Sequence, residues 1–168
     1  SGLFLAPVNQ TVQLGTLSFV NDGNTLTVTP SNGYGLEFTG TTTFNKNFTT
    51  VSVGTAAASN VVQGLTLSGQ VTGTAPGGVA FTKTGAGTLV LNSASNDFVG
   101  SIVVGTGTNS ATFGVLAFNS DAALGNAANT ITLNGGGTTG KATIRAYGGG
   151  SISTSRTINL WGNSQGAN

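Results

Sequence analysis

The fold is decided by six short segments that recur between residues 88 and 160. They read TLVL at 88–91, SIVV at 101–104, VLAF at 115–118, TITL at 130–133, ATIRA at 142–146 and TINL at 157–160. Among the strand-like segments of the whole chain, most alternate apolar residues with Thr or Ser, as strands do when one face is buried and the other is wet. The centres of the six segments follow one another at nearly equal steps, at positions 89, 103, 116, 131, 144 and 158. This regular step predicts a solenoid in which Leu89 stacks on Leu116, and Ile131 on Ile158.

Strand-like segments of the same kind fill the earlier part of the chain, from Thr11–Leu14 onward. Helix patterns are nearly absent, and only 56–58 and 121–124 suit a single helical turn. We therefore predict an all-β chain that forms a parallel β-helix, or β-solenoid. The alternative is a β-sandwich, which would more often show hairpins at roughly 8–12-residue spacing and charges that protect its edges.

The composition agrees with a stack of coils. The chain has 168 residues, of which 28 are Gly and only nine are charged, for a formal net charge of +1. Gly, Thr, Asn and Ser together make up just over half of it. In stacked coils equal positions lie in register, so repeated charges would repel. A net charge of +1 gives no positively charged surface of the kind that binds nucleic acid. Apolar runs of four or five residues are too short for membrane insertion.

Missing residue types exclude several kinds of chemistry. The chain has no His, Cys or Met. Zinc or haem sites built from imidazole or thiolate, and Ser–His–Asp or Cys–His mechanisms, are therefore excluded. We predict a protein that is not an enzyme and has no catalytic residues, cofactor or metal.

Residues 79–92, VAFTKTGAGTLVLN, carry a motif. The segment resembles the passenger-associated repeat of bacterial autotransporters, whose core is K-x-G-x-G-T-L-x-L. The residues that match are Lys83, Gly85, Gly87, Thr88, Leu89 and Leu91, then Asn96, Phe98 and Gly100 of an N-x-Y-x-G turn, Leu124 and Gly125 of A-L-G, Ile131 and Leu133 of I-T-L-N-G-G, and Arg156, Ile158 and Leu160 of S-R-x-I-x-L. The departures are Phe98 for the usual Tyr and the loop at 106–110.

The resemblance covers about residues 79–162, whereas residues 1–78 carry only the generic strand pattern. It implies a right-handed parallel β-helix exposed at a bacterial surface, in which the motif residues are structural. We expect residues 1–78 and 79–168 to be two parts of one continuous domain. The expected function is a structural or adhesive extracellular segment that acts as a rigid stalk or scaffold, with surface glycans as candidate partners.

Two other functions stay open. The chain stops soon after a strand without a polar capping helix, so its end coils should stack on another copy or on further coils of a longer chain. That predicts a self-assembling subunit of an extracellular filament or sheath. A polysaccharide-binding or polysaccharide-cleaving β-helix is the third candidate, disfavoured because the four acidic residues are spread widely, from Asp22 to Asp121.

The acidic residues are candidates for acid–base catalysis. Asp97 and Asp121 are separated in sequence by close to one coil, so they are placed to form a carboxylate pair as sugar hydrolysis requires. Asp22 and Glu37 are the other two acids and lie closer together in sequence. The more favoured interpretation gives Asp97, Asp121 and Asp22 to turns.

Other residues admit a functional and a structural interpretation. Lys83 either contacts an anionic partner or forms a salt bridge, or lays its stem over a strand. Tyr34, Tyr147 and Trp161 either stack on sugar rings or serve as core and edge residues. The Gly triplets at 135–137 and 148–150 lack the lysine and helix of a phosphate loop and are interpreted as turns. Asn9 and Asn47 fit the N-glycosylation pattern, which arises readily by chance in a Thr-rich chain.

Overall fold

A computed structural model describes residues 10–31, 34–55, 64–107, 112–136, 140–148 and 150–162. These residues form fifteen strands and one 3-10 helix. They are β1 (Gln10–Leu14), β2 (Leu17–Ser18), β3 (Thr25–Val28), β4 (Tyr34–Phe38), β5 (Thr42–Thr43), β6 (Thr50–Val53), β7 (Leu65–Leu67), β8 (Val71–Thr72), β9 (Thr74–Thr84), β10 (Thr88–Leu91), β11 (Val99–Val104), β12 (Thr112–Phe118), η1 (Ala122–Leu124), β13 (Ile131–Asn134), β14 (Lys141–Ala146) and β15 (Ile158–Trp161).

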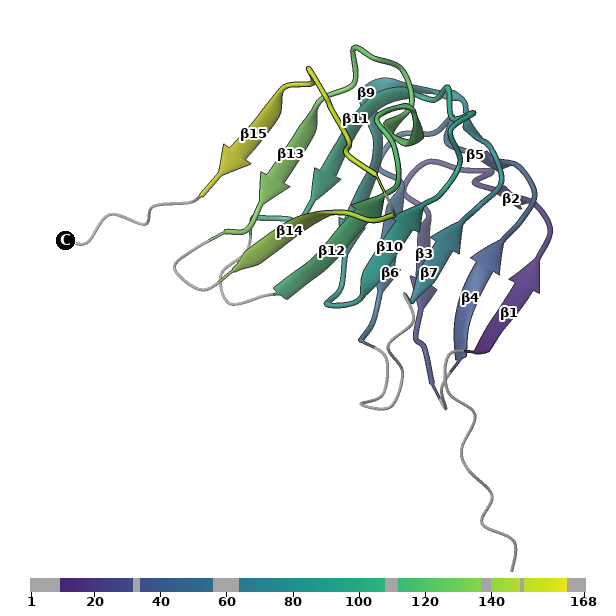
Figure 1. Ribbon diagram of the computed structural model, residues 1–168. Helices are drawn as coiled ribbons and strands as arrows, with labels where there is room; N and C mark the ends of the chain where they lie inside the picture. The colour runs from purple at the N-terminus through teal and green to yellow at the C-terminus, as the bar shows by residue number, and fades with distance from the viewer. Residues whose placement is uncertain are drawn as a thin grey trace, which may run out of the picture.

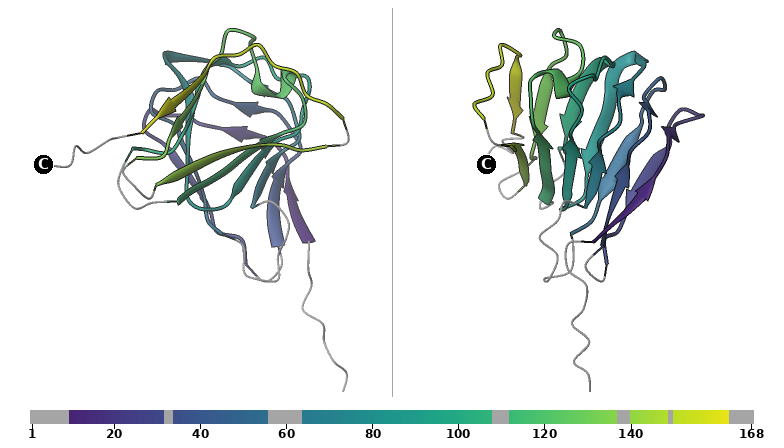
Figure 2. Two further views of the ribbon diagram at one scale, coloured as in Figure 1. Left: turned by 60° about the vertical axis from the view of Figure 1, so that its left-hand side comes forward. Right: turned by 45° about the vertical axis from the view of Figure 1, so that its right-hand side comes forward.

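The strands wind into a parallel β-solenoid of about five turns (Figure 1). Sheet A has the order β1-β4-β7-β10-β12-β14, sheet C the order β3-β6-β9-β11-β13-β15, and the short sheet B the order β2-β5-β8. We number the coils from the first, β1–β3, through β4–β6, β7–β9, β10–β11 and β12–β13 to the sixth, β14–β15. Figure 2 shows the coils following one another along the axis from purple to yellow.

Every pairing between the named strands is parallel. The prediction of a parallel β-helix is therefore confirmed, and the β-sandwich alternative was wrong because hairpins would give antiparallel ladders. The predicted registers hold as well: Leu89 pairs with Leu116, and Ile131 pairs with Ile158. Strand β9 itself runs across residue 78, where the specific sequence resemblance begins.

Aromatic residues fill the interior of the first four coils. Rings of Phe19, Phe44, Phe81 and Phe98 follow one another along the axis, with centroids 5.2, 4.7 and 6.2 Å apart. All four are almost fully buried. Stacked aromatic pairs contribute about 0.5–1.5 kcal/mol each beyond their buried area, so this column stabilises the coils against sliding.

Corners of the coils bring backbones into direct contact. A Cβ at Gly87 would lie 1.9 Å from the carbonyl oxygen of Gly54, and one at Gly114 would lie 2.0 Å from the carbonyl oxygen of Gly87. Gly114 also has a positive φ of 65°. Only residues without a side chain fit a corner where stacked turns approach so closely.

Helical structure is confined to one turn among the described residues. The helix η1 occupies the region 121–124 where a single turn was predicted, while the other predicted turn, at 56–58, lies outside the described residues. Within the described part of the chain, no helix is long and apolar enough to cross a membrane.

Candidate functional site

The core of the repeat motif forms a corner and the strand that follows it. Gly85 has a positive φ of 73°, and its backbone turns the chain from sheet C into sheet A. Leu89 and Leu91 point into the interior from β10 and are fully buried, while Thr88 is half-buried. Gly87 makes the close corner contact described above. The motif thus supplies the turn and the inward rows of one coil.

Lys83 lies inside the solenoid, not on its surface. Its side chain is fully buried, and β9 pairs it with Val51 on one side and Val104 on the other. The ammonium Nζ donates to the carbonyl oxygens of Thr84 (2.9 Å), Gly85 (2.7 Å) and Phe113 (2.8 Å). The predicted surface roles of Lys83 were therefore wrong: its full burial leaves no access for an anionic partner, its stem does not lie on the surface, and no carboxylate of the described residues pairs with it.

The environment of Lys83 disfavours its charge. Burial lowers the pKa of its amine to about 7 from the usual 10.5. The cause is loss of hydration, because a buried ammonium gives up its water shell. Three carbonyl oxygens replace that shell, and one of them, from Phe113, belongs to the next corner along the axis. Lys83 consequently joins two adjacent corners through its ammonium group.

The turn residues Asn96, Phe98 and Gly100 are also structural. The side chain of Asn96 accepts from the amide of Val71 in the third coil and donates to the carbonyl oxygen of Ala123 in the fifth, both at 2.7 Å. Phe98 ends the aromatic column in place of the usual Tyr. Gly100 has a φ of 140° and lies against Ala80. These residues therefore tie the fourth coil to both of its neighbours.

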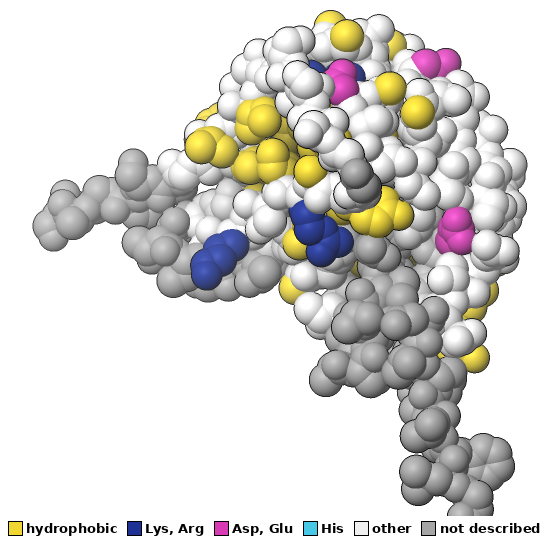
Figure 3. Space-filling model, in the orientation of Figure 1, with side chains coloured by type: hydrophobic (Ala, Val, Ile, Leu, Met, Phe, Trp, Pro, Cys, Tyr) yellow, Lys and Arg dark blue, Asp and Glu magenta, His cyan; other side chains and the backbone are white. Residues whose placement is uncertain are grey.

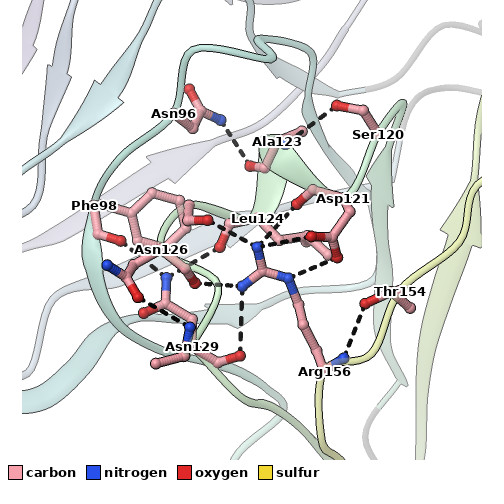
Figure 4. A network of polar contacts seen from close by, with 12 residues as sticks. Asn96, Phe98, Ser120, Asp121, Ala123, Leu124, Asn126, Asn129, Thr154 and Arg156 are labelled. Atoms are coloured by element: carbon pink, nitrogen blue, oxygen red, sulfur yellow. Dashed lines mark hydrogen bonds and ion pairs between the residues drawn. The ribbon is translucent and has the colours of Figure 1, made fainter.

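Arg156 occupies the centre of a polar network on the side of the solenoid (Figure 4). Its side chain is 2% exposed and forms an ion pair of 2.8 Å with Asp121. The guanidinium also donates to the carbonyl oxygens of Asp121 (3.0 Å) and Gly125 (2.8 Å), and to those of Asn126 and Asn129. Arg156 thereby binds the turn around η1, which also contains the buried Leu124, and fastens the sixth coil to the fifth.

Asn129 adds three further hydrogen bonds next to this network. Its side-chain amide donates to the carbonyl oxygens of Phe98 (2.9 Å) and Leu124 (3.0 Å), and its Oδ1 accepts from the amide of Gly100 (2.9 Å). The arrangement satisfies the polar backbone groups that an irregular turn leaves unpaired. Sequence analysis missed Asn129, although Asn is common where a side chain must serve backbone groups of a turn.

The sixth coil leaves an open end. The inward rows of sheet C end at Ile158, which stacks on Ile131, and Leu160, which stacks on Leu133. Ile158 is 39% exposed and Leu160 is 79% exposed, since β15 is the last strand of sheet C among the described residues. A hollow of about 410 Å³ opens here between β13, β14 and β15. Figure 3 shows hydrophobic side chains gathered near β13 and β15, with Lys and Arg side chains close by.

The first coil forms the opposite end. Its strand β1 has one neighbour, β4, and its inward residues Val12 and Leu14 are 46% and 44% exposed. A hollow of about 370 Å³ lies between β1, β3 and the start of β4. Both ends of the described solenoid thus present exposed apolar side chains on their terminal strands.

The proposed carboxylate pair of Asp97 and Asp121 does not form. Asp121 is engaged with Arg156, and this hydrogen bond and charge lower the pKa of its carboxyl. Asn96 donates to the carbonyl oxygen of Ala123 in the next coil, so these two positions lie beside each other in adjacent coils. Asp97 therefore lies beside the residue that follows Ala123, whereas Asp121 precedes Ala123 in the sequence. The pair was the less favoured interpretation of these two residues, and it fails because the coil is longer than the interval between the two acids.

Asp22 and Glu37 are separate too. Asp22 accepts from the backbone and side chain of Asn47 at 2.9 and 3.3 Å, which lower the pKa of its carboxyl. Glu37 accepts from Gln13 at 2.9 Å in sheet A, and hydrogen bonds from Ser68 and Gln13 lower its pKa. Within the described ranges, no group of three or more His, Cys, Asp or Glu residues is placed to hold a metal ion.

Remaining candidates are dispersed. Tyr34 lines the hollow at the first coil and Trp161 the hollow at the sixth, while the backbone amide of Tyr147 donates to Phe118. Each Gly triplet lies partly outside the described residues, as do the 106–110 loop and Asn9. The side chain of Asn47 is engaged with Asp22.

Comparison with known proteins adds no relative: no protein-family model, no curated protein and no solved structure matches this chain.

Proposed function

We propose that this chain is a structural or adhesive segment of an extracellular bacterial surface protein, in which the β-solenoid serves as a rigid stalk or scaffold rather than as an enzyme. One observation carries the proposal. The parallel sheets A and C each run through six strands, and buried Phe, Leu and Val rows fill the space between them. Such a stack transmits force along its axis through backbone hydrogen bonds, which suits a spacer. The resemblance of residues 79–162 to autotransporter repeats supports the location.

Surface labelling tests this proposal. Antibodies raised against the purified chain are expected to label intact cells of the source organism, and brief protease treatment of intact cells should remove the signal. An antibody against a cytoplasmic protein serves as the control for cell integrity. Labelling that requires permeabilised cells would contradict an extracellular role.

A second function is favoured by the two open ends. Sheet A begins with β1 and ends with β14, while sheet C begins with β3 and ends with β15. The next copy in a row would therefore place its β1 on β14 and its β3 on β15, continuing both ladders in parallel. The exposed Leu160 and Trp161 would be covered in the process. This geometry supports a self-assembling filament or sheath subunit.

Sedimentation velocity over a range of concentrations separates the two functions. Assembly through the ends predicts larger species as concentration rises, and their loss in the double variant Leu160→Lys, Trp161→Lys. Val99→Lys is the matched control, because Val99 is 42% exposed on the side of the fourth coil, away from both ends. A chain that stays monomeric at high concentration rules out the filament.

A further inference from the structure

Phe48 combines two features that cost stability. Among the described residues it is the one non-glycine residue with positive φ, at 56°, a conformation that bulky side chains rarely adopt. Its ring is 81% exposed, so burial offsets little of that strain. Glycine would adopt the same conformation without strain. Strained residues whose packing does not explain them occur mainly at functional sites.

Phe48 borders a hollow in the side of the solenoid. The hollow has a volume of about 140 Å³ and lies between the turn before β6 and the outer face of β9 and β11. Its wall consists of Asn47, Phe48, Gly77, Val79, Thr82 and Val103. The hollow is small enough to suit one ring of a larger molecule, and none of these residues carries a charge.

One polar atom in this wall, the buried Oδ1 of Asn47, has no hydrogen-bond partner. The Nδ2 and the backbone amide of Asn47 are held by Asp22. The Oδ1 faces Gly77, where a Cβ would lie only 2.6 Å away. Thr82 supplies a half-buried side chain with a hydroxyl group beside it.

A row of hydroxyl groups leads away from the hollow. Thr82 stacks on Thr50, and Thr50 stacks on Thr25, in the outward row of sheet C. Neighbouring strands lie about 4.8 Å apart, so the row offers one hydroxyl group per coil at regular intervals. A linear ligand with repeating polar groups would meet an equivalent partner at each step.

We infer that this hollow binds a neutral oligosaccharide, with one sugar ring stacked on Phe48 and the rest of the chain following the Thr82–Thr50–Thr25 row. The apolar face of a pyranose ring matches the exposed aromatic ring, and its hydroxyl groups match the hydroxyl group of Thr82. The uncharged wall selects a neutral glycan. This inference deepens the adhesive role proposed above and rests on it for the presence of glycans.

Titration of the isotope-labelled chain with cellohexaose, maltohexaose and chitohexaose tests the inference by NMR. At least one of these oligosaccharides should shift the amide signals of Phe48, Gly77 and Thr82 in a saturable manner. Phe48→Gly should weaken that binding at least tenfold without lowering the melting temperature, because it removes the ring and the strain together. Thr82→Val should weaken binding and keep the fold. Val20→Ala, at another exposed apolar residue, is the matched control.

Several outcomes overturn the inference. One is the absence of shifts with all three sugars, and another is a melting temperature that falls in Phe48→Gly, which would make Phe48 a structural residue. Salt-sensitive binding of polygalacturonate alone would replace the neutral ligand by an acidic one. Loss of self-association in Phe48→Gly would assign the ring to a protein contact. Surface labelling of cells is independent of these results, so failure of the glycan site and failure of the extracellular role are distinguishable.

Discussion

Two buried cations, Lys83 and Arg156, perform the same task by different means. Each side chain is almost fully buried, and each donates hydrogen bonds to backbone carbonyl oxygens of irregular turns. Arg156 has a carboxylate partner in Asp121. Lys83 has only carbonyl oxygens, and burial lowers its pKa to about 7. The two cations therefore differ in their partners: Arg156 is paired with a carboxylate, while Lys83 has carbonyl oxygens alone and holds its proton only weakly.

The difference follows from where the two groups lie. Lys83 takes a place in an inward row between Val51 and Val104, where a carboxylate would add a second charge to desolvate. Arg156 lies on the side of the solenoid, and Asp121 is 36% exposed there. Solvent lowers the cost of a charge pair at the edge of the structure. A chain with few charges thus uses its cations mainly to satisfy carbonyl groups that the ladders leave unpaired.

The largest effect is expected for Lys83→Ala. The variant loses three hydrogen bonds and leaves an empty space, so the free energy of unfolding should fall by about 3 kcal/mol or more. Urea unfolding followed by circular dichroism measures it. Lys83→Met is the matched control, since it keeps most of the volume and removes only the donors. Equal stability of Lys83→Ala and wild type would show that the buried amine contributes nothing.

Arg156→Ala should have the next largest effect, about 2 kcal/mol, because Asp121 loses its partner and several carbonyl oxygens lose a donor. Hydrogen exchange should increase mainly in the 120–129 turn and in β15. Arg156→Lys should recover only part of the loss, since one ammonium cannot reproduce the planar fork. Full recovery by lysine would mean that charge alone matters.

The pH dependence should distinguish the two cations. Between pH 7 and about 10.5 the unfolded chain holds the Lys83 proton and the folded chain does not. The unfolded state then binds more protons, so stability should rise with pH in this window, by at most about 1.4 kcal/mol per unit. Comparison of wild type with Lys83→Met across pH 6 to 10 isolates the effect. A difference between them that stays constant with pH would contradict it.

The smallest effect is expected at Asp121 in acid. Its carboxyl pKa is lowered in the folded chain, so its contribution is complete above the unfolded pKa of about 3.9 and is lost as pH falls through the folded value. Partial exposure and solvent screening keep this contribution near or below about 1 kcal/mol. Asp121→Asn should therefore lower stability slightly at pH 7, and this loss should shrink as the pH falls through the folded pKa. A larger loss at pH 2 would exclude the ion pair as the cause.

Much of the fold could be predicted from periodicity. The even step between strand centres from Leu89 to Ile158 reflects alternation between sheets A and C, and it led to the correct registers. The inward position of Lys83 was also accessible, because Lys83 and Phe81 have the same parity in one strand. The positive charge of Lys83 led us instead to predict a surface position for it. In a strand, however, alternate residues face opposite sides whatever their charge.

Other features could not be predicted because they depend on turns. The Asp121–Arg156 pair joins segments far apart in sequence, and its geometry depends on how the turn before β13 and the segment before β15 fold. The sequence spacing placed Asp97 beside Asp121 in the next coil. The hydrogen bond from Asn96 to Ala123 shows that the coil is longer at this corner, and spacing alone did not reveal that length. Phe48 gave no sequence signal, since positive φ is a property of the folded turn and Phe does not favour it.

The pairing of each coil with its immediate neighbours has a consequence for how the gene can change. Stability in such arrays is the sum of terms for each repeat and for each interface between adjacent repeats. A segment the length of one coil, such as the stretch that begins at Leu89 and ends just before its stacking partner Leu116, can therefore be duplicated or deleted while both ladders continue. Inserting a single residue inside a strand instead turns its inward row to the outside. The length of this molecule is thus free to vary in steps of whole coils.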